Sequence, residues 1–287
     1  CALPILTQAV AEALGIKDNI PEGLKAVPYE ELLAAANEVG FSASPVVDGT
    51  YYPEKTIDDE GTFTGISKDI PLVISTVYAE MSGTLQKLLF EQQDAVCTAD
   101  IYGGDAQAAI EEKYGEHAQE VINAFKEAYP DKDLEDLLYI NTGRSDSTAL
   151  SKSAQGGADV YQAIFAWKLP VFGGTQSWHT GGDVPFIFAN ADKEGYLIAG
   201  NEEGAYAFQD VCSSALINFA YTGNPSPDGL EWTPFTSENE ATMVFDTNSE
   251  VRSGHDKTLL SLLNEYAPED PMGGFEAYRK VEKESKK

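Results

Sequence analysis

Basic residues are scarce in this sequence. Its 287 residues include 19 lysines and arginines against 47 acids, which gives a formal net charge of −28 at pH 7. A field of that sign repels phosphates, so we expect no nucleic-acid partner, and it equally disfavours anionic membranes. The acids are scattered along predicted helices rather than gathered in one tail, which is typical of a solvated surface that keeps a protein soluble.

Cysteines and long apolar runs are also few. No run approaches the roughly 18 residues of a membrane-spanning helix. Cys1, Cys97 and Cys212 form no CxxC pair and no metal-ligand spacing, and their odd number allows at most one internal disulfide. Cys97 and Cys212 lie in helical patterns, where each is expected to be a small buried hydrophobic residue.

The N-terminus has neither an initiator methionine nor a signal peptide. Because the chain starts at Cys1, we expect the natural N-terminus to lie upstream, so the missing signal says nothing about secretion. The compartment, cytoplasmic or secreted, stays open.

What is present is a sizeable apolar fraction, 43% of the residues, which can form a large core. Continuous apolar runs predict strands buried on both faces over 69–81 and 159–170, and a short strand over 242–246. Apolar residues at helical spacing predict helices over 6–16, 28–40, 84–96, 105–129, 203–225 and 259–266. Strands alternate with helices, which predicts a layered α/β fold.

Two residues follow predicted buried strands, where α/β sheets place their functional side chains. Glu80 stands at the end of the 69–81 stretch, after its apolar run, and His179 follows the second strand; an acid followed by a histidine is the order of the last two triad members in α/β-hydrolases. The carboxylate would orient the imidazole, which would take a proton from the nucleophile and return it to the leaving group. The alternative is a surface glutamate and a structural histidine.

No nucleophile for that pair is visible, because the sequence contains no G-x-S-x-G pentapeptide. His179 with Asp183 lacks a nearby third ligand, so no metal site is predicted, and no cofactor is expected. His117 falls on the apolar side of its helix and is predicted to be a core or boundary residue, whereas His255 is predicted to be exposed at the start of the last helix.

Four segments in matching order resemble the type-B carboxylesterases, a family that includes the cholinesterases. They are "FSASPVVDGTYYP", "IPLVISTVYAEMSGTL", "SWHTGGDVPFIFAN" and "LINFAYTGNPSPDGLEWTPFTSENEATMVFD". The resemblance places Glu80 at the acid position and His179 in the histidine loop of a Ser-Glu-His triad. Asp183 departs from the pattern, since it stands four residues after His179 where the family has an acid three residues after.

The resemblance implies an α/β-hydrolase fold, a mostly parallel sheet flanked by helices. In this family the serine elbow and the oxyanion hole lie upstream of the helix predicted over 6–16. We therefore expect residues 1–287 to be a single incomplete domain, the C-terminal portion of the fold, with a helical cap-like insertion over 84–140 and a frayed tail over 276–287. A sheet cut through its middle would expose an edge strand and apolar faces.

The implied function is that of the C-terminal part of a serine carboxylic-ester hydrolase. Its substrate would be a small-molecule carboxylic ester, and its partner the missing N-terminal half, in the same polypeptide or as a second chain. Without the nucleophile, the chain alone is expected to be inactive. Met81 and Trp178 are expected to line the alcohol side of the substrate pocket, with core packing as the alternative. The alternative functions are a non-catalytic esterase-like binding or adhesion module and an unrelated α/β ligand-binding protein.

Overall fold

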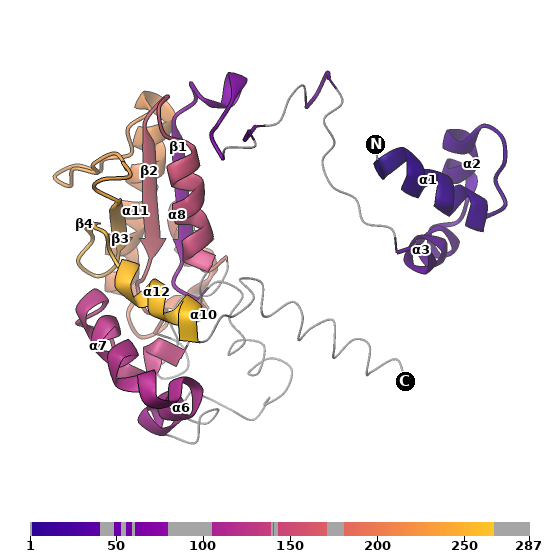
Figure 1. The fold of residues 1–287 in the computed structure, drawn as a ribbon. Coiled ribbons are helices and arrows are strands. Elements are labelled where there is room, and N and C mark those ends of the chain that lie inside the picture. Colours follow the sequence, from indigo (N-terminus) through magenta and orange to yellow (C-terminus); the bar gives the residue numbers. More distant parts are fainter. Residues whose placement is uncertain are drawn as a thin grey trace. The chain divides into compact units, whose positions relative to one another are not determined.

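The computed structural model describes residues 2–40, 49–52, 56–58, 61–79, 105–138, 140, 143–170 and 181–266. The chain divides into two compact units, residues 1–58 and residues 59–287, which are coloured along the sequence in Figure 1. No helix among the described residues is long and apolar enough to cross a membrane.

The first unit is helical. It contains α1 (Ala2–Ala13), α2 (Ile20–Ala26) and α3 (Tyr29–Glu38), which confirms the helices predicted over 6–16 and 28–40. The sequence patterns missed α2, because this short helix includes Pro21 and Gly23. Proline is tolerated in a first helical turn, whose N–H groups have no partner within the helix. A Cβ atom at Gly23 would lie 2.6 Å from Cγ2 of Ile16, so glycine permits the close approach of α2 to the preceding turn.

The second unit is built on a four-stranded sheet with the order β1-β2-β3-β4 (Figure 1). Its strands are β1 (Leu72–Val77), β2 (Val160–Phe165), β3 (Ala241–Phe245) and β4 (Glu250–Ser253). The first three are parallel, and β4 is antiparallel to β3. The three strands predicted from apolar runs are confirmed, whereas β4 was missed because its sequence, "EVRS", carries two charges and one apolar residue.

The helices of this unit include four that frame the sheet and its carboxyl edge. They are α7 (Ala118–Ala128), α8 (Gly143–Ser153), α11 (Glu202–Thr222) and α12 (Lys257–Tyr266). Shorter elements are the 3-10 turns η1 (Gly65–Ser67), η3 (Gly115–His117), η4 (Leu134–Leu138) and η6 (Ala191–Lys193), with α6 (Ala106–Tyr114), α9 (Val184–Ile187) and α10 (Gly195–Ile198).

The helix predicted over 105–129 is two helices. Gly115 has a φ of +56°, a backbone conformation that favours glycine, and the 3-10 turn η3 separates α6 from α7. Both helices nevertheless present apolar side chains at helical spacing to the core, since Ile110, Tyr114, Val121 and Phe125 are all buried. The helix predicted over 84–96 lies outside the described residues.

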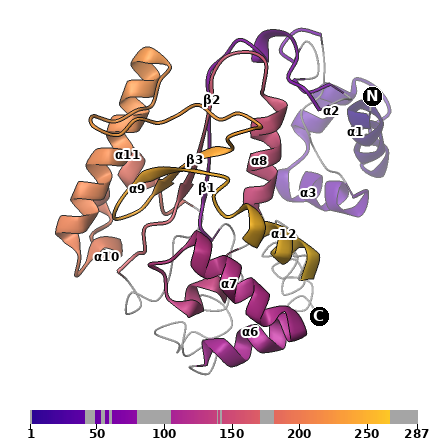
Figure 2. The same ribbon diagram turned by 60° about the vertical axis from the view of Figure 1, so that its left-hand side comes forward.

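The sheet is covered on both faces, with α8 on one side and α11 on the other (Figure 2). Alternate residues of β2 point to opposite faces, as a pleated strand requires. Tyr161 and Phe165 meet rings of α11, whereas the Gln162 amide hydrogen-bonds Thr148 of α8. All six residues of β2 are buried, which confirms the strand predicted there to be buried on both faces.

The prediction of burial on both faces is wrong for β1. Val73 is 37% exposed and Ile70, before the strand, is 53% exposed, because β1 is the edge strand of the described sheet. An apolar groove of about 380 Å³ runs between β1 and α11. Leu216, an apolar residue of the helix predicted over 203–225, lines this groove and is 38% exposed.

Candidate functional site

The four predicted site residues, Glu80, Met81, Trp178 and His179, lie outside the described residues. The described residues that precede Glu80 and the 171–180 segment continue two strands of the sheet. Tyr78 and Ala79 continue β1, and each is 1% exposed. The 171–180 segment follows β2 after a buried stretch that includes Ala166, Trp167 and Leu169.

The two strands end side by side. Val77, the last residue of β1, pairs in parallel register with Phe165, the last residue of β2. Main-chain bonds extend the alignment past the strands, because Tyr78 N donates to Phe165 O at 2.9 Å and Ala166 N donates to Phe245 O at 2.7 Å. The segments leading to Glu80 and toward His179 therefore leave the same carboxyl edge of the sheet from neighbouring strands.

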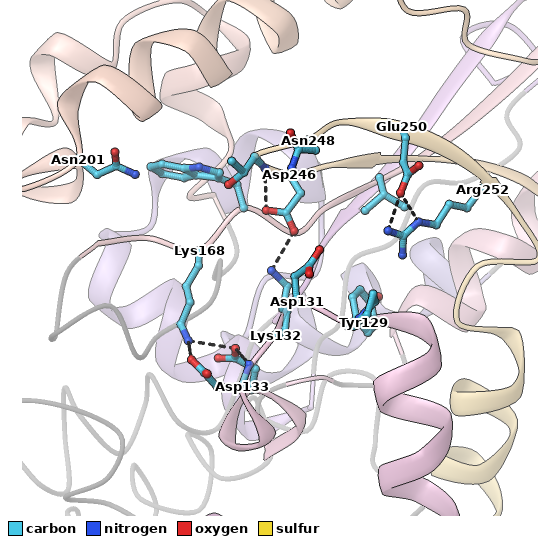
Figure 3. Close-up of a pocket in the computed structure, with 15 residues that line it drawn as sticks. Tyr129, Asp131, Lys132, Asp133, Lys168, Asn201, Asp246, Asn248, Glu250 and Arg252 are labelled. Carbon is cyan, nitrogen blue, oxygen red and sulfur yellow. Dashed lines mark hydrogen bonds and ion pairs between the residues drawn. The ribbon is translucent and has the colours of Figure 1, made fainter.

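A charged cleft of about 510 Å³ opens at this edge, beside β2 and β3 (Figure 3). Lys132 lies at its centre, with a side chain that is 7% exposed. Its ammonium donates to the carbonyl oxygen of Ala166 and, at 3.0 Å, to Oδ2 of Asp246, which directly follows β3. This lysine joins the carboxyl ends of two strands.

A second lysine of the cleft, Lys168, binds two carboxylates. Its Nζ lies 2.9 Å from Oδ2 of Asp133 and 3.0 Å from Oδ2 of Asp136, as Figure 3 shows for Asp133. Burial acts to lower the pKa of Lys168, but the hydrogen bond and charge of each aspartate raise it above its ordinary value. Lys168 therefore stays cationic, as its role in an ion pair requires.

Asp136 is the buried half of that pair. Its side chain is fully buried, and Oδ2 also accepts a hydrogen bond from the backbone N–H of Asp133 at 3.1 Å. Burial raises the pKa of Asp136, and the charge of Lys168 acts against that rise. Sequence reasoning missed this cluster. The one available signal was the Lys-Asp alternation in "YPDKDLED" within a chain poor in lysine.

His255 is not exposed, so that prediction is wrong. The residue is 6% exposed, and its ring meets Tyr129 edge-on, with the ring centroids 4.8 Å apart. Burial lowers its pKa to about 3, helped by the charges of Arg144 and Arg252. His255 lies in the turn between β4 and α12, where Asp256 has a φ of +54°. This neutral histidine belongs to the core.

The surroundings of His255 form a buried polar network of their own. Arg144 Nε donates to Oδ2 of Asp256 at 3.1 Å, and the Tyr129 hydroxyl donates to the same oxygen at 2.9 Å. Arg144 also donates to Thr242 at 2.9 Å. Because Thr242 lies near the amino end of β3, the network reaches from Tyr129, which lines the cleft, toward the amino end of that strand.

Two further residues considered from the sequence, His117 and Cys212, lie where expected, whereas Cys97 lies outside the described residues. His117 is half-exposed and stacks on Tyr266 at 3.7 Å, as a boundary residue. Cys212 is 2% exposed, and burial, then the charge of Asp183, raises the pKa of its thiol. Within the described part of the chain, no group of three or more His, Cys, Asp or Glu residues could hold a metal ion.

Comparison with known proteins fits this arrangement. The family model described as "Carboxylesterase family" matches residues 6–262. The chain is 25% identical over 261 residues to a para-nitrobenzyl esterase of Bacillus subtilis, a match that covers 85% of this chain and 50% of that protein.

Solved structures give the same result. An esterase of Clostridium hathewayi, described as able to hydrolyse aliphatic aromatic polyesters, is 27% identical with a TM-score of 0.74, covering 91% of this chain and 52% of that one. A carboxylesterase of Geobacillus stearothermophilus is 24% identical, with a TM-score of 0.54, covering 89% and 54%. The chain thus spans about half the length of these relatives. Its sheet and its family match together show that the chain belongs to the carboxylesterase family and has the α/β-hydrolase fold.

Proposed function

We propose that this chain supplies Glu80 and His179 to the Ser-Glu-His triad of a serine carboxylic-ester hydrolase. The observation that carries the proposal is the parallel register of Val77 with Phe165. It brings the segment that precedes Glu80 beside the segment that leads to His179, at the sheet edge where α/β folds hold their active sites.

The chemistry follows from the residue types. His179 takes the proton of the serine hydroxyl as the serine oxygen attacks the ester carbonyl, and it returns that proton to the departing alcohol. Water then repeats the cycle on the acyl-serine and releases the acid. Glu80 holds the imidazole in the required tautomer and stabilises its cationic form. No cofactor takes part, and Met81 and Trp178 line the alcohol side of the pocket.

The serine and the oxyanion hole belong, in this proposal, to a second half of the enzyme outside this sequence. Two observations support it. The chain spans about half the length of its relatives. The edge strand β1 presents an open apolar groove, lined by Val73, Phe165, Leu216 and Phe219, that a further layer of the fold would cover. The chain alone is then inactive, because it lacks the serine and the oxyanion hole, which contribute most to the rate enhancement.

The test compares two proteins, this chain alone and this chain joined to the polypeptide encoded directly upstream of Cys1. With p-nitrophenyl acetate as the probe, only the joined protein is expected to give turnover that a serine-directed phosphonate abolishes. In it, Glu80→Gln and His179→Gln should each lower kcat by a factor of about 10³–10⁴ or more, and His117→Gln should leave kcat unchanged.

Two results would overturn the proposal. Phosphonate-sensitive turnover by the chain alone would place a nucleophile within these 287 residues. An inactive joined protein whose upstream half lacks a G-x-S-x-G elbow would favour the alternative, a non-catalytic esterase-like binding or adhesion module.

A further inference from the structure

We infer that Lys132 is a positioning residue, which fixes Glu80 relative to His179 by tying together the carboxyl ends of β1, β2 and β3. This inference rests on the proposed function, because it gives Lys132 a role only if Glu80 and His179 act as a pair. Lys132 touches neither the substrate nor the reacting atoms in this scheme.

Lys132 reaches the ends of three strands at once. Its ammonium donates to the carbonyl oxygen of Ala166 after β2 and to Asp246 after β3. It also lies 5.7 Å from the ring centroid of Tyr78 after β1, within the range of a cation–π interaction. The side chain is 7% exposed, so water competes little with these contacts and they act in a medium of low dielectric constant.

Tyr78 is the link to the predicted acid, since it precedes Glu80 by two residues. Its hydroxyl donates to the backbone carbonyl of Asp136 at 3.0 Å, and its ring meets Tyr129 edge-on at 5.1 Å. Lys168 anchors Asp136 in turn, at 3.0 Å. The 129–136 segment thus braces the end of β1 against β2, and Lys132 stands at the centre of that segment.

Such a brace has a catalytic consequence because proton transfer depends on geometry. A displacement of about 1 Å at a reacting group can lower a rate by a factor of about 10². A merely structural role for Lys132 would change stability and leave the Glu80–His179 interaction intact. The two roles therefore differ in what they do to the titration of His179.

The experiment follows the histidine Cε1–H resonances of the full chain by NMR as the pH is raised. The chain has three histidines, and Gln variants of His117, His179 and His255 assign each signal. Glu80→Gln is expected to lower the pKa of His179, because a carboxylate nearby favours the imidazolium form. Lys132→Met should lower it in the same direction and by a comparable shift, since Glu80 is no longer held.

The direction of the shift separates positioning from simple charge. Removing a positive charge by itself would raise the pKa of His179, opposite to the shift expected from a misplaced Glu80. Lys152→Met is the matched control. It removes the same charge from an exposed lysine paired with Glu240, and it should not lower the pKa of His179. Lys132→Arg should restore most of the wild-type titration.

A second variant covers the case in which Lys132→Met does not fold. Tyr78→Phe changes no charge and removes only the hydroxyl that reaches Asp136, and it should also lower the pKa of His179. If Glu80→Gln shifts His179 but Tyr78→Phe and any folded Lys132 variant do not, the positioning role is refuted and the proposed function stands. If Glu80→Gln itself leaves His179 unmoved, the proposed pair fails, and the positioning role fails with it.

Discussion

Acidification from pH 7 to pH 5 is expected to destabilise the unit formed by residues 59–287, because the fold holds His255 neutral. Its pKa is lowered from 6.5 to about 3 by burial first and by Arg144 and Arg252 second. Because the pKa of His255 is lower in the folded state than in the unfolded state, the stability that depends on neutral His255 is fully present above pH 6.5 and is lost as the pH falls toward 3. Each pH unit below 6.5 costs about 1.4 kcal/mol in the free energy of unfolding, so His255 alone should lower that free energy by about 2 kcal/mol at pH 5.

Neighbouring groups also titrate, and the protonation of Asp256 changes the stability in the opposite direction. Burial raises the pKa of Asp256, so its cost to stability is relieved as the pH falls. The comparison that isolates His255 is therefore between the wild type and His255→Gln, in which Asp256, Tyr129 and both arginines remain. The variant should lose less stability between pH 7 and pH 5 than the wild type does, by about 2 kcal/mol.

Tryptophan fluorescence supplies the assay. All three tryptophans lie in the second unit, and Trp167 and Trp232 are each 2% exposed, so their emission reports the unfolding of this unit in urea. His117→Gln, which removes a half-exposed histidine, should keep the pH dependence of the wild type. Parallel losses for the wild type and His255→Gln would refute the reasoning.

Three further substitutions test the packing. Phe208→Ala should cost about 3–5 kcal/mol in urea unfolding, because this buried ring stacks on Trp167 at 5.3 Å; a loss below 1 kcal/mol would contradict that contact. Gly223→Ala should cost about 1 kcal/mol, since Gly223 ends α11 with a φ of +77°, whereas Gly195→Ala, in open space without a positive φ, should cost less. Val73→Lys places a charge on the edge strand β1, so it should scatter less light than the wild type at the same concentration, with an unchanged urea midpoint. Equal scattering would show that the edge of β1 does not drive self-association.

Local sequence patterns predicted the elements that are rich in apolar residues. The runs that became β2 and β3 are buried throughout. Helix α11 buries Phe208, Cys212 and Ala215 and ends at Gly223, although Leu216 of the same apolar pattern is 38% exposed. The elements that were missed are either polar, as β4 and α8 are, or short, since α9 and α10 have four residues each and α2 has seven. Helix α8 has the sequence "GRSDSTALSKS", and its long-range contribution comes from the buried hydrogen bonds of Arg144 to Thr242 and Asp256, which are distant in the sequence.

The same distinction explains the site. His255 was predicted to be exposed, but it is buried against Tyr129, which lies more than a hundred residues earlier in the chain. The Lys132–Asp246 contact joins residues 114 positions apart, so no local pattern contains it. Glu80 and His179 were chosen by the order of motifs in a known family, and their pairing stays a prediction.

The parallel register also has a consequence for how the chain acquires its fold. Leu72 pairs with Val160, and Gln162 pairs with Thr242, so each parallel contact closes a loop of about 80 residues, which is slow because of the chain entropy lost. The β3–β4 hairpin, joined by a short turn after Asp246, closes quickly by comparison. On the ribosome, β1 and β2 emerge long before β3, and we expect these two apolar strands to depend on chaperones until the third strand arrives to complete the sheet.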